Sequence, residues 1–321
     1  MINPTLESLA ANARDALGGT GELHSDIPEE LPRYELFGSA NSICSQKVRV
    51  VLAHHGLPYV NQAVNLFLGQ TYLPEYVRLR MKGCEQFGGA LASHHGGSTS
   101  ASGGGCDGVV VPTLIDWQSG DVIVDSKRIC LHLDSQVAAA DKLYPDDLAA
   151  AIDEDLAVVD NMPNYQMLMD RDLGASETDA TRDSFGGNFS QKKVAWCDRY
   201  LEEHADDPVL VAAYTAKRAK ELSAANALFS PEAMQAAYGR ARTALIALER
   251  KLERRDGAWL YGDDATMADL FWGVELLRMK NIGVATFWEG GRLPQVERFS
   301  ATIEALGSIR TAIIEWPGAM F

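Results

Sequence analysis

Ser42 and Cys44 lie two residues apart in the stretch S-I-C-S-Q-K-V-R, residues 42–49, where a strand-like pattern gives way to a helical one. In the first turn of a helix, unpaired N–H groups and the helix dipole favour the charged form of a cysteine. The thiolate is the form that attacks other atoms and exchanges disulfides. We therefore expect Cys44 to be a nucleophile, and the simpler alternative is a small buried side chain.

A second candidate stretch is V-V-V-P-T-L-I-D, residues 109–116, followed after a Q-S-G turn by D-V-I-V, residues 121–124. The two apolar runs around a short turn predict a β-hairpin. Pro112 interrupts the first run, and proline is disfavoured inside a strand. We predict a cis Pro112 in a bend before the strand; this bend is either part of a site or only a change of direction.

Asp125 and Ser126 begin the helical stretch D-S-K-R-I-C-L-H-L. Both are residue types that cap the start of a helix. The unpaired N–H groups and the dipole at such a start also bind carboxylates. These two residues are therefore either a plain cap or an anion site.

The elements that must position these motifs follow from the spacing of apolar residues. Residues 34–135 predict a strand, a helix, a strand and a helix, then two strands and a helix, which is a βαβ unit followed by a ββα unit. After a linker at 135–145, the periodic segments of residues 146–321 all have helical spacing, and residues 171–190 predict a polar loop between them. The predicted fold class is an α/β domain followed by an all-α domain.

Composition limits the classes of partner. The 321 residues are 46% hydrophobic and carry a formal charge of −15, so the chain is globular and has no basic surface for nucleic acid. No apolar run is long enough to span a membrane, and the first residues lack the basic and apolar regions expected of a secretory signal. We expect a cytoplasmic protein whose cysteines are reduced thiols, at positions 44, 84, 106, 130 and 197.

Two segments fall outside these elements. Residues 1–33 predict a loosely packed N-terminal extension, and the Gly- and Ser-rich residues 83–108 predict a flexible insertion. The insertion holds cysteines and histidines, but their spacing matches no compact zinc pattern, so we expect no metal. The residues concerned are Cys84, His94, His95 and Cys106.

The order of motifs over 34–135 and 146–317 resembles cytosolic glutathione transferases. The shared features are V-P-T-L before a hairpin, D-S at the next helix start, and the capping box T-M-A-D at 266–269. S-I-C-S-x-K, together with Y-V-R-L before V-V-P-T-L and the endings W-L-Y-G-D…A-D-L-F-W and I-I-E-W-P-G, is similar to the glutathione-dependent reductive dehalogenases of chlorinated hydroquinones. The resemblance implies a thioredoxin-like glutathione-binding domain, a helical-bundle substrate domain and a homodimer.

The resemblance also implies a role for each motif residue. Val111, before cis Pro112, would pair its N–H and C=O with the cysteinyl part of glutathione. Ser126 would hold the γ-glutamyl carboxylate, and Asp125 would help with the amine. Ser42 would donate a hydrogen bond to the glutathione sulfur, and Lys47, one turn further along, would add positive charge.

In the dehalogenases that it resembles, glutathione displaces halide from the ring, and the cysteine thiolate then attacks the sulfur of the adduct. A second glutathione resolves the resulting mixed disulfide. Here that cysteine would be Cys44, with Ser42 at the same sulfur. The alternatives are a thioether-forming transferase or an aryl-ether-cleaving lyase, for which Ser42 suffices, and a non-catalytic glutathione-binding module.

The remaining candidates have weaker signals. A kink at Pro163 would let the side chains that follow line an apolar substrate pocket, although core packing predicts the same pattern. Two arginines of the predicted helix 74–82 are candidates for binding an anionic substrate or a glutathione carboxylate. We assign Cys130 and Cys197 to the core. The other residues of these groups are Tyr165, Met167, Met169, Arg78 and Arg80.

Overall fold

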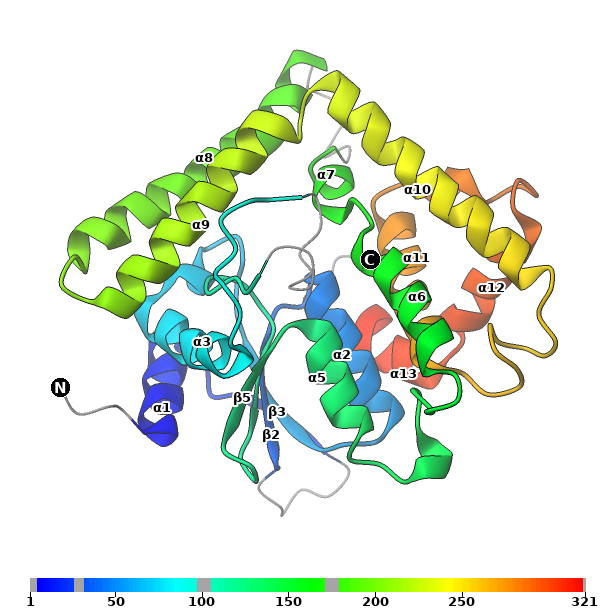
Figure 1. The fold of residues 1–321 in the computed structure, drawn as a ribbon, viewed down its shortest axis with the longest axis horizontal. Helices are drawn as coiled ribbons and strands as arrows, with labels where there is room; N and C mark the ends of the chain where they lie inside the picture. The colour runs from blue at the N-terminus through cyan, green and yellow to red at the C-terminus, as the bar shows by residue number, and fades with distance from the viewer. Residues whose placement is uncertain (1–4, 26–31, 97–104, 171–178, 320–321) are drawn as a thin grey trace.

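The computed structural model describes residues 5–25, 32–96, 105–170 and 179–319 (Figure 1). Parts of the predicted N-terminal extension (1–4 and 26–31) and of the predicted insertion (97–104) lie outside the described residues. No helix of the described ranges is long and apolar enough to cross a membrane.

The first half of the chain is built on a five-stranded sheet of order β1-β3-β2-β4-β5. β2 and β3 run parallel, and the other neighbours are antiparallel. The strands are β1 (Glu22–His24), β2 (Tyr34–Gly38), β3 (Tyr59–Ala63), β4 (Thr113–Asp116) and β5 (Asp121–Val124). The sequence predicted four of these strands and missed β1, which extends the sheet by pairing with β3.

Alternation along the strands divides the sheet into two apolar faces. Leu36, Leu114 and Ile123 join the core on the side of α2 (Ile43–His54) and α5 (Ser126–Asp134). Their neighbours Phe37, Ile115 and Val122 join a second core with α1 (Leu6–Leu17) and α3 (Pro74–Phe87). The sheet is therefore the middle layer of a three-layer α/β domain, and the predicted βαβ and ββα units are confirmed.

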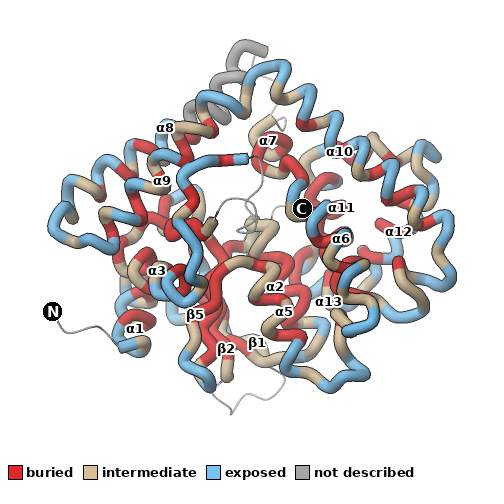
Figure 2. Tube along the Cα trace, in the orientation of Figure 1, coloured by how far each residue is buried: buried red, intermediate tan, exposed pale blue. Residues whose placement is uncertain are grey.

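The second half is helical, as predicted. Figure 1 shows α8 and α9 as an antiparallel pair on one side and α10 descending on the other. Figure 2 shows exposed residues along the outer faces of these helices and buried ones in the sheet. The helices are α6 (Ala149–Asp160), α7 (Asn164–Met169), α8 (Asp179–Glu203), α9 (Pro208–Ala227), α10 (Pro231–Leu252), α11 (Met267–Asn281), α12 (Pro294–Glu304) and α13 (Gly307–Ile309), with shorter turns η1 (Gln70–Tyr72), η2 (Ala139–Asp141), η3 (Ala285–Phe287) and η4 (Arg310–Ile314).

α11 is the central helix of this half, buried on all sides from Met267 to Met279. The predicted capping box at its start is present, because the N–H and the hydroxyl of Thr266 both donate to the Asp269 carboxylate, at 2.8 and 2.7 Å. α11 packs against α2 of the first half, so the two halves share one continuous core.

The described parts of the insertion are more ordered than its composition predicted. α3 continues to Phe87, and backbone bonds join Cys106 to Ala90 and Ala92. Cys84 and Cys106 form a disulfide, so the expectation that all five cysteines are reduced was wrong. The sequence held no signal for this pair, because the two residues meet only after the chain returns from the Gly- and Ser-rich segment.

Candidate functional site

The strand register brings the three sequence motifs to one edge of the sheet. Phe37 near the end of β2 pairs with Thr113 at the start of β4, and Thr113 pairs with Val124 at the end of β5. The loop into α2, the segment before β4 and the start of α5 therefore all leave from this edge. These connections carry Ser42 and Cys44, Val111 and Pro112, and Asp125 and Ser126.

Ser42 is the N-cap of α2, and Cys44 is the second residue of that helix. The Ser42 Oγ accepts a hydrogen bond from the Ser45 N–H at 3.3 Å, which leaves its own hydroxyl hydrogen to donate to a ligand. Cys44 is a thiol of intermediate exposure, whereas the other two thiols, Cys130 and Cys197, are buried. Cys44 is thus the reduced cysteine that a small molecule can reach.

Two buried arginines fix the loop that precedes α2. Arg49 donates to the carbonyl oxygens of Ser39 and Ala40, both at 3.0 Å, and Arg278 donates to that of Asn41 at 2.6 Å. Arg49 also lies over the Trp316 ring, 4.3 Å from its centroid, and burial lowers its pKa to about 10. The C-terminal half therefore helps to hold the loop that precedes Cys44, through Arg278 and the Ala312 carbonyl that accepts from Arg49, which the sequence did not predict.

Lys47 lies one turn beyond Cys44 and is buried. Its Nζ lies 2.8 Å from an Asp160 oxygen and 4.5 Å from the Phe271 ring centroid. Burial alone would lower the pKa of Lys47, but the negative charges of Asp160 and Cys44 outweigh burial and raise the pKa above its ordinary value. The structure therefore directs this ammonium toward the helical half while keeping it within electrostatic range of Cys44.

The Val111–Pro112 peptide bond is cis, as predicted. None of the hydrogen bonds among the described residues uses the Val111 N–H or C=O. Arg80 instead bonds the Pro112 carbonyl oxygen at 2.5 Å, and Tyr76 bonds that of Val110 at 2.7 Å. The backbone of Val111 is thus held in place with both of its polar groups available.

Asp125 has a positive φ of 76°, the one such value among the described residues other than glycine. Its ψ of 123° lies outside the left-handed helical region, a conformation that costs about 1–3 kcal/mol and is concentrated at functional sites. Its carboxylate caps α5 by accepting from the Arg128 N–H at 3.2 Å. Ser126 follows as the first residue of α5, and it is buried.

The sequence is similar to known proteins. Residues 41–136 match the family described as glutathione S-transferase, N-terminal domain. The chain is 33% identical over 290 residues to 2,5-dichlorohydroquinone reductive dechlorinase of Sphingobium indicum, covering 89% of this chain and 84% of that protein. The chain belongs to the glutathione S-transferase family. It is accordingly an enzyme, and the predicted fold class is confirmed.

Two further likenesses are more distant. The chain is 23% identical to the tetrachloro-p-hydroquinone reductive dehalogenase of Sphingobium chlorophenolicum, covering 90% of this chain and 100% of that protein. It superposes on the β-etherase LigF of Sphingobium sp. strain SYK-6 with a TM-score of 0.56 and 14% identity, covering 88% of this chain and 100% of that one. The second likeness concerns the fold alone.

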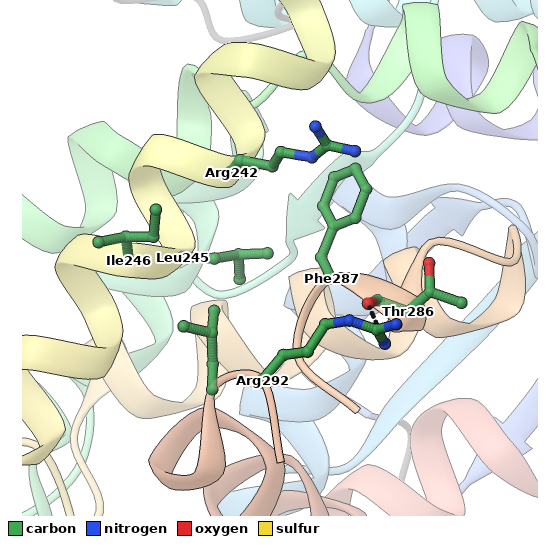
Figure 3. A pocket seen from close by; sticks show the side chains of 7 residues that line it. Arg242, Leu245, Ile246, Thr286, Phe287 and Arg292 are labelled. Carbon is green, nitrogen blue, oxygen red and sulfur yellow. Dashed lines mark hydrogen bonds between the residues drawn. The ribbon is translucent and has the colours of Figure 1, made fainter. Parts of the chain in front are cut away.

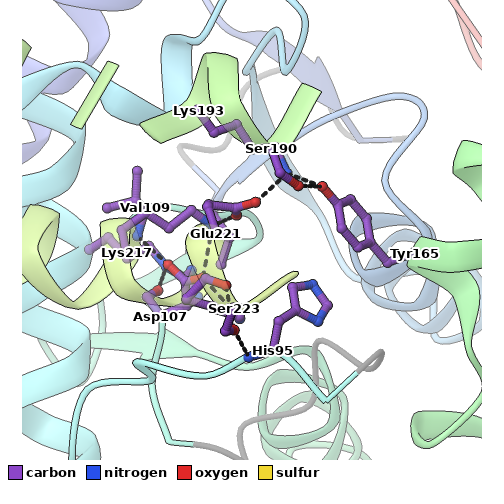
Figure 4. A network of polar contacts seen from close by, with 12 residues as sticks. His95, Asp107, Val109, Tyr165, Ser190, Lys193, Lys217, Glu221 and Ser223 are labelled. Atoms are coloured by element: carbon purple, nitrogen blue, oxygen red, sulfur yellow. Dashed lines mark hydrogen bonds and ion pairs between the residues drawn. The ribbon is translucent and has the colours of Figure 1, made fainter. Parts of the chain in front are cut away.

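In this glutathione S-transferase family member, a buried polar network ties the insertion to the helical half (Figure 4). One Asp107 oxygen lies 2.9 Å from Lys217 Nζ and 3.0 Å from Lys220 Nζ, and Lys217 also pairs with Glu221. Burial alone would raise the pKa of Asp107, but the two lysines hold it well below its ordinary value. His95 stacks on Tyr165, with ring centroids 4.7 Å apart.

The structure shows the partners of several of the weaker candidates. Tyr165 shares a hydrogen bond with Ser190 at 2.8 Å and stacks on His95, so it belongs to the polar network. Met167 is buried in the main core. Arg78 pairs with Asp207 at 3.0 Å, and Arg80 is committed to backbone carbonyls.

A surface hollow of about 420 Å³ lies between α10 and the segment from η3 to α12 (Figure 3). No residue of the three motifs lines it. The Arg242 guanidinium lies over the Phe287 ring, 4.4 Å from its centroid, and Arg292 donates to the Thr286 carbonyl oxygen. The charged groups that line the hollow therefore already have partners within it. The hollow is therefore not our candidate for the functional site.

The residues that sequence reasoning missed come from the helical half. Asp160, Glu275 and Arg278 surround the start of α2, yet each is more than a hundred residues from it along the chain. A charged residue inside an apolar helical stretch, such as Glu275 and Arg278 of α11, was the available signal.

Proposed function

We propose that this chain is a glutathione-dependent reductive dehalogenase that removes chlorine from a chlorinated hydroquinone. The observation that carries the proposal is the position of Cys44: a reachable thiol in the first turn of α2, two residues from Ser42 and at the same sheet edge as the other motifs. The reductive dechlorinase of Sphingobium indicum, 33% identical over most of both chains, supports the substrate class.

Glutathione is the co-substrate. Val111 offers an N–H and a C=O to its extended backbone, and the start of α5 offers unpaired N–H groups to its γ-glutamyl carboxylate. Ser126 donates to that carboxylate, and the Asp125 carboxylate receives the amine. Ser42 donates its hydroxyl hydrogen to the sulfur, which favours the thiolate.

The reaction proceeds in three steps. The glutathione thiolate attacks the quinoid ring, a carbon–sulfur bond forms and chloride leaves. The Cys44 thiolate then attacks that sulfur, the electron pair of the carbon–sulfur bond passes to the ring carbon, and this carbon takes up a proton. A second glutathione thiolate attacks the mixed disulfide, releases glutathione disulfide and restores Cys44. Two glutathiones are oxidised as one chlorine is replaced by hydrogen.

Mass spectrometry after turnover tests the proposal directly. Protein mixed with a chlorohydroquinone and limiting glutathione, then quenched in acid, should carry one glutathione on the peptide that contains Cys44, and a reductant should remove it. Cys130 and Cys197 serve as internal controls because both are buried. A protein that releases dechlorinated product while Cys44 stays unmodified would indicate a route without the mixed disulfide.

Glutathione binding should also stabilise the protein. At 100 times its dissociation constant, glutathione should add about 2.7 kcal/mol to the free energy of unfolding. Ser126→Ala should weaken binding about ten- to hundredfold, because a hydrogen bond to a charged group contributes about 1.5–3 kcal/mol. Calorimetric titration measures the affinity, and urea unfolding with and without glutathione measures the stabilisation. Ser135→Ala is the matched control, because Ser135 is the C-cap at the opposite end of α5; equal losses in both variants would refute the assignment.

The homodimer and the domain boundaries 34–135 and 146–321 remain predictions from the resemblance. We propose that glutathione binds to the first domain and that the second domain supplies the aromatic substrate pocket beside α6 and α7.

A further inference from the structure

One face of α3 holds the segment 106–113, which leads into β4. Tyr76, Arg80 and Cys84 are spaced four residues apart, so their side chains lie one above another along that face. All three are buried. Each is bonded to the segment 106–113, the first two through hydrogen bonds and Cys84 through its disulfide. The segment is therefore attached to one helix at three successive turns.

The two hydrogen-bonding side chains fix the main chain on both sides of Val111. Tyr76 donates to the Val110 carbonyl oxygen at 2.7 Å, and Arg80 donates to that of Pro112 at 2.5 Å. The Val110 carbonyl and the Val111 N–H belong to one planar peptide group. The bond from Tyr76 therefore also sets the direction in which the Val111 N–H points.

The disulfide is the last attachment of this row. It joins Cys84 to Cys106, and the next residue, Asp107, offers its carbonyl oxygen to Arg80 at 2.6 Å. Val111 follows Cys106 by only five positions. A crosslink that holds a loop in its binding conformation increases affinity, because less freedom is lost when the ligand binds. The disulfide is therefore placed to hold the segment that presents Val111.

The same disulfide also packs behind the start of α5. Cys84 and Cys106 form a small buried cluster with Val124, the last residue of β5. Gly83 lies so close to Val124 that a Cβ atom at this glycine would be 2.6 Å from that side chain. Val124 directly precedes Asp125, the N-cap of α5. The disulfide thus contacts the supports of two of the three motifs at this sheet edge.

We propose that the Cys84–Cys106 disulfide positions Val111 and the start of α5 for glutathione, so that the affinity for glutathione depends on the redox state of this pair. Both cysteines are then positioning residues, because they act on the ligand through the main chain that follows them. The inference rests on the proposed glutathione site and adds a determinant of its affinity.

The proposed reaction supplies both reagents that change the state of the pair. A glutathione thiolate attacks one sulfur of the disulfide and forms a mixed disulfide, and the released protein thiolate takes up a proton. A second glutathione thiolate attacks the mixed disulfide, glutathione disulfide leaves, and the other protein thiolate is protonated. The reverse exchange consumes glutathione disulfide, which the dehalogenation releases. Because both cysteines are buried, exchange requires a local opening, and the two forms can be prepared separately.

Calorimetric titration with S-methylglutathione tests the proposal, because this analogue has no thiol and cannot exchange with the disulfide. The wild type is compared as purified, after reduction with dithiothreitol and removal of the reagent, and after reoxidation. The reduced form should bind about tenfold more weakly or worse, and reoxidation should restore the affinity. Thiol titration in urea identifies the forms, with three thiols in the oxidised protein and five in the reduced one.

The double variant Cys84→Ala, Cys106→Ala should bind as weakly as the reduced wild type, with or without dithiothreitol. In initial-rate measurements it should show a KM for glutathione raised about tenfold with kcat nearly unchanged, which is the signature of lost binding without lost chemistry. Cys197→Ala is the matched control, because it removes a buried cysteine that is not in the disulfide. It should respond to dithiothreitol as the wild type does.

Equal affinities of the oxidised wild type, the reduced wild type and the double variant would overturn the proposal. Loss of the whole melting transition on reduction would also overturn it, because the disulfide would then support the fold and not the position of Val111. If the oxidised wild type does not bind S-methylglutathione, the proposed glutathione site itself is refuted, and this inference with it. The two failures are therefore distinguishable.

Discussion

Cys44→Ser should stop the reaction at the ring–glutathione thioether. A serine hydroxyl cannot accept the glutathionyl group, so the first step continues while the reductive step loses its nucleophile. We expect chloride release to persist and formation of the dechlorinated hydroquinone to fall by about 10³-fold or more. Chromatography with mass detection of the products over time measures the ratio of thioether to hydroquinone.

The matched controls for this variant are Cys130→Ser and Cys197→Ser. Both thiols are buried, and burial raises the pKa of Cys197 to about 12, so neither supplies a thiolate at neutral pH. These variants should keep the wild-type ratio of products. If Cys44→Ser also keeps that ratio, Cys44 has no redox role. A product that is all thioether in both proteins would then indicate a thioether-forming transferase, for which Ser42 suffices.

The sequence was sufficient for the parts of the site that are set by local chemistry. A serine before a helical pattern, a proline between two apolar runs and an Asp-Ser pair at a helix start each have a local physical cause. The structure places them as the N-cap of α2, the cis bend before β4 and the N-cap of α5. The alternation of apolar residues determines which sheet face each strand residue covers. The strand register then brings the three motifs to one edge of the sheet.

Features that depend on pairing over long chain distances were not predictable. β1 is three residues long and exists because it pairs with β3, and the Cys84–Cys106 disulfide crosses a segment without periodicity. Asp160 reaches Lys47 across 113 positions. In each case the residue types have several acceptable partners, and only the packed fold selects one of them.

The described part of the insertion connects the first half of the chain to α9, which its composition did not predict. The insertion begins at the end of α3. Near its C-terminal end, Asp107 pairs with Lys217 of α9, a few residues before the Val111–Pro112 bend. The same Asp107 that joins the insertion to α9 therefore also sets the start of the segment that presents Val111. Asp107 therefore connects the helical half with the segment that leads to the proposed glutathione site.

Asp107→Asn should lower the free energy of unfolding by about 3–5 kcal/mol, because it leaves buried Lys220 without its carboxylate and Lys217 with Glu221 alone. The amide keeps the shape of the side chain and can still accept the 2.9 Å hydrogen bond from the Val109 N–H, so the loss reports charge rather than volume. Urea unfolding at pH 7 measures this loss in the free energy of unfolding. Asp198→Asn is the control, because Asp198 and Arg218 form an exposed pair expected to contribute less than about 1 kcal/mol.

The pH dependence of this difference provides an independent check. The pKa of Asp107 is lower in the folded protein than its ordinary value, so its stabilisation is present above the unfolded pKa of about 3.9 and is lost as the pH falls through the folded pKa. The wild type and Asp107→Asn should therefore differ fully at pH 7 and converge in strong acid. A difference below about 1 kcal/mol at pH 7, or one that does not shrink in acid, would show that the two lysines do not depend on Asp107.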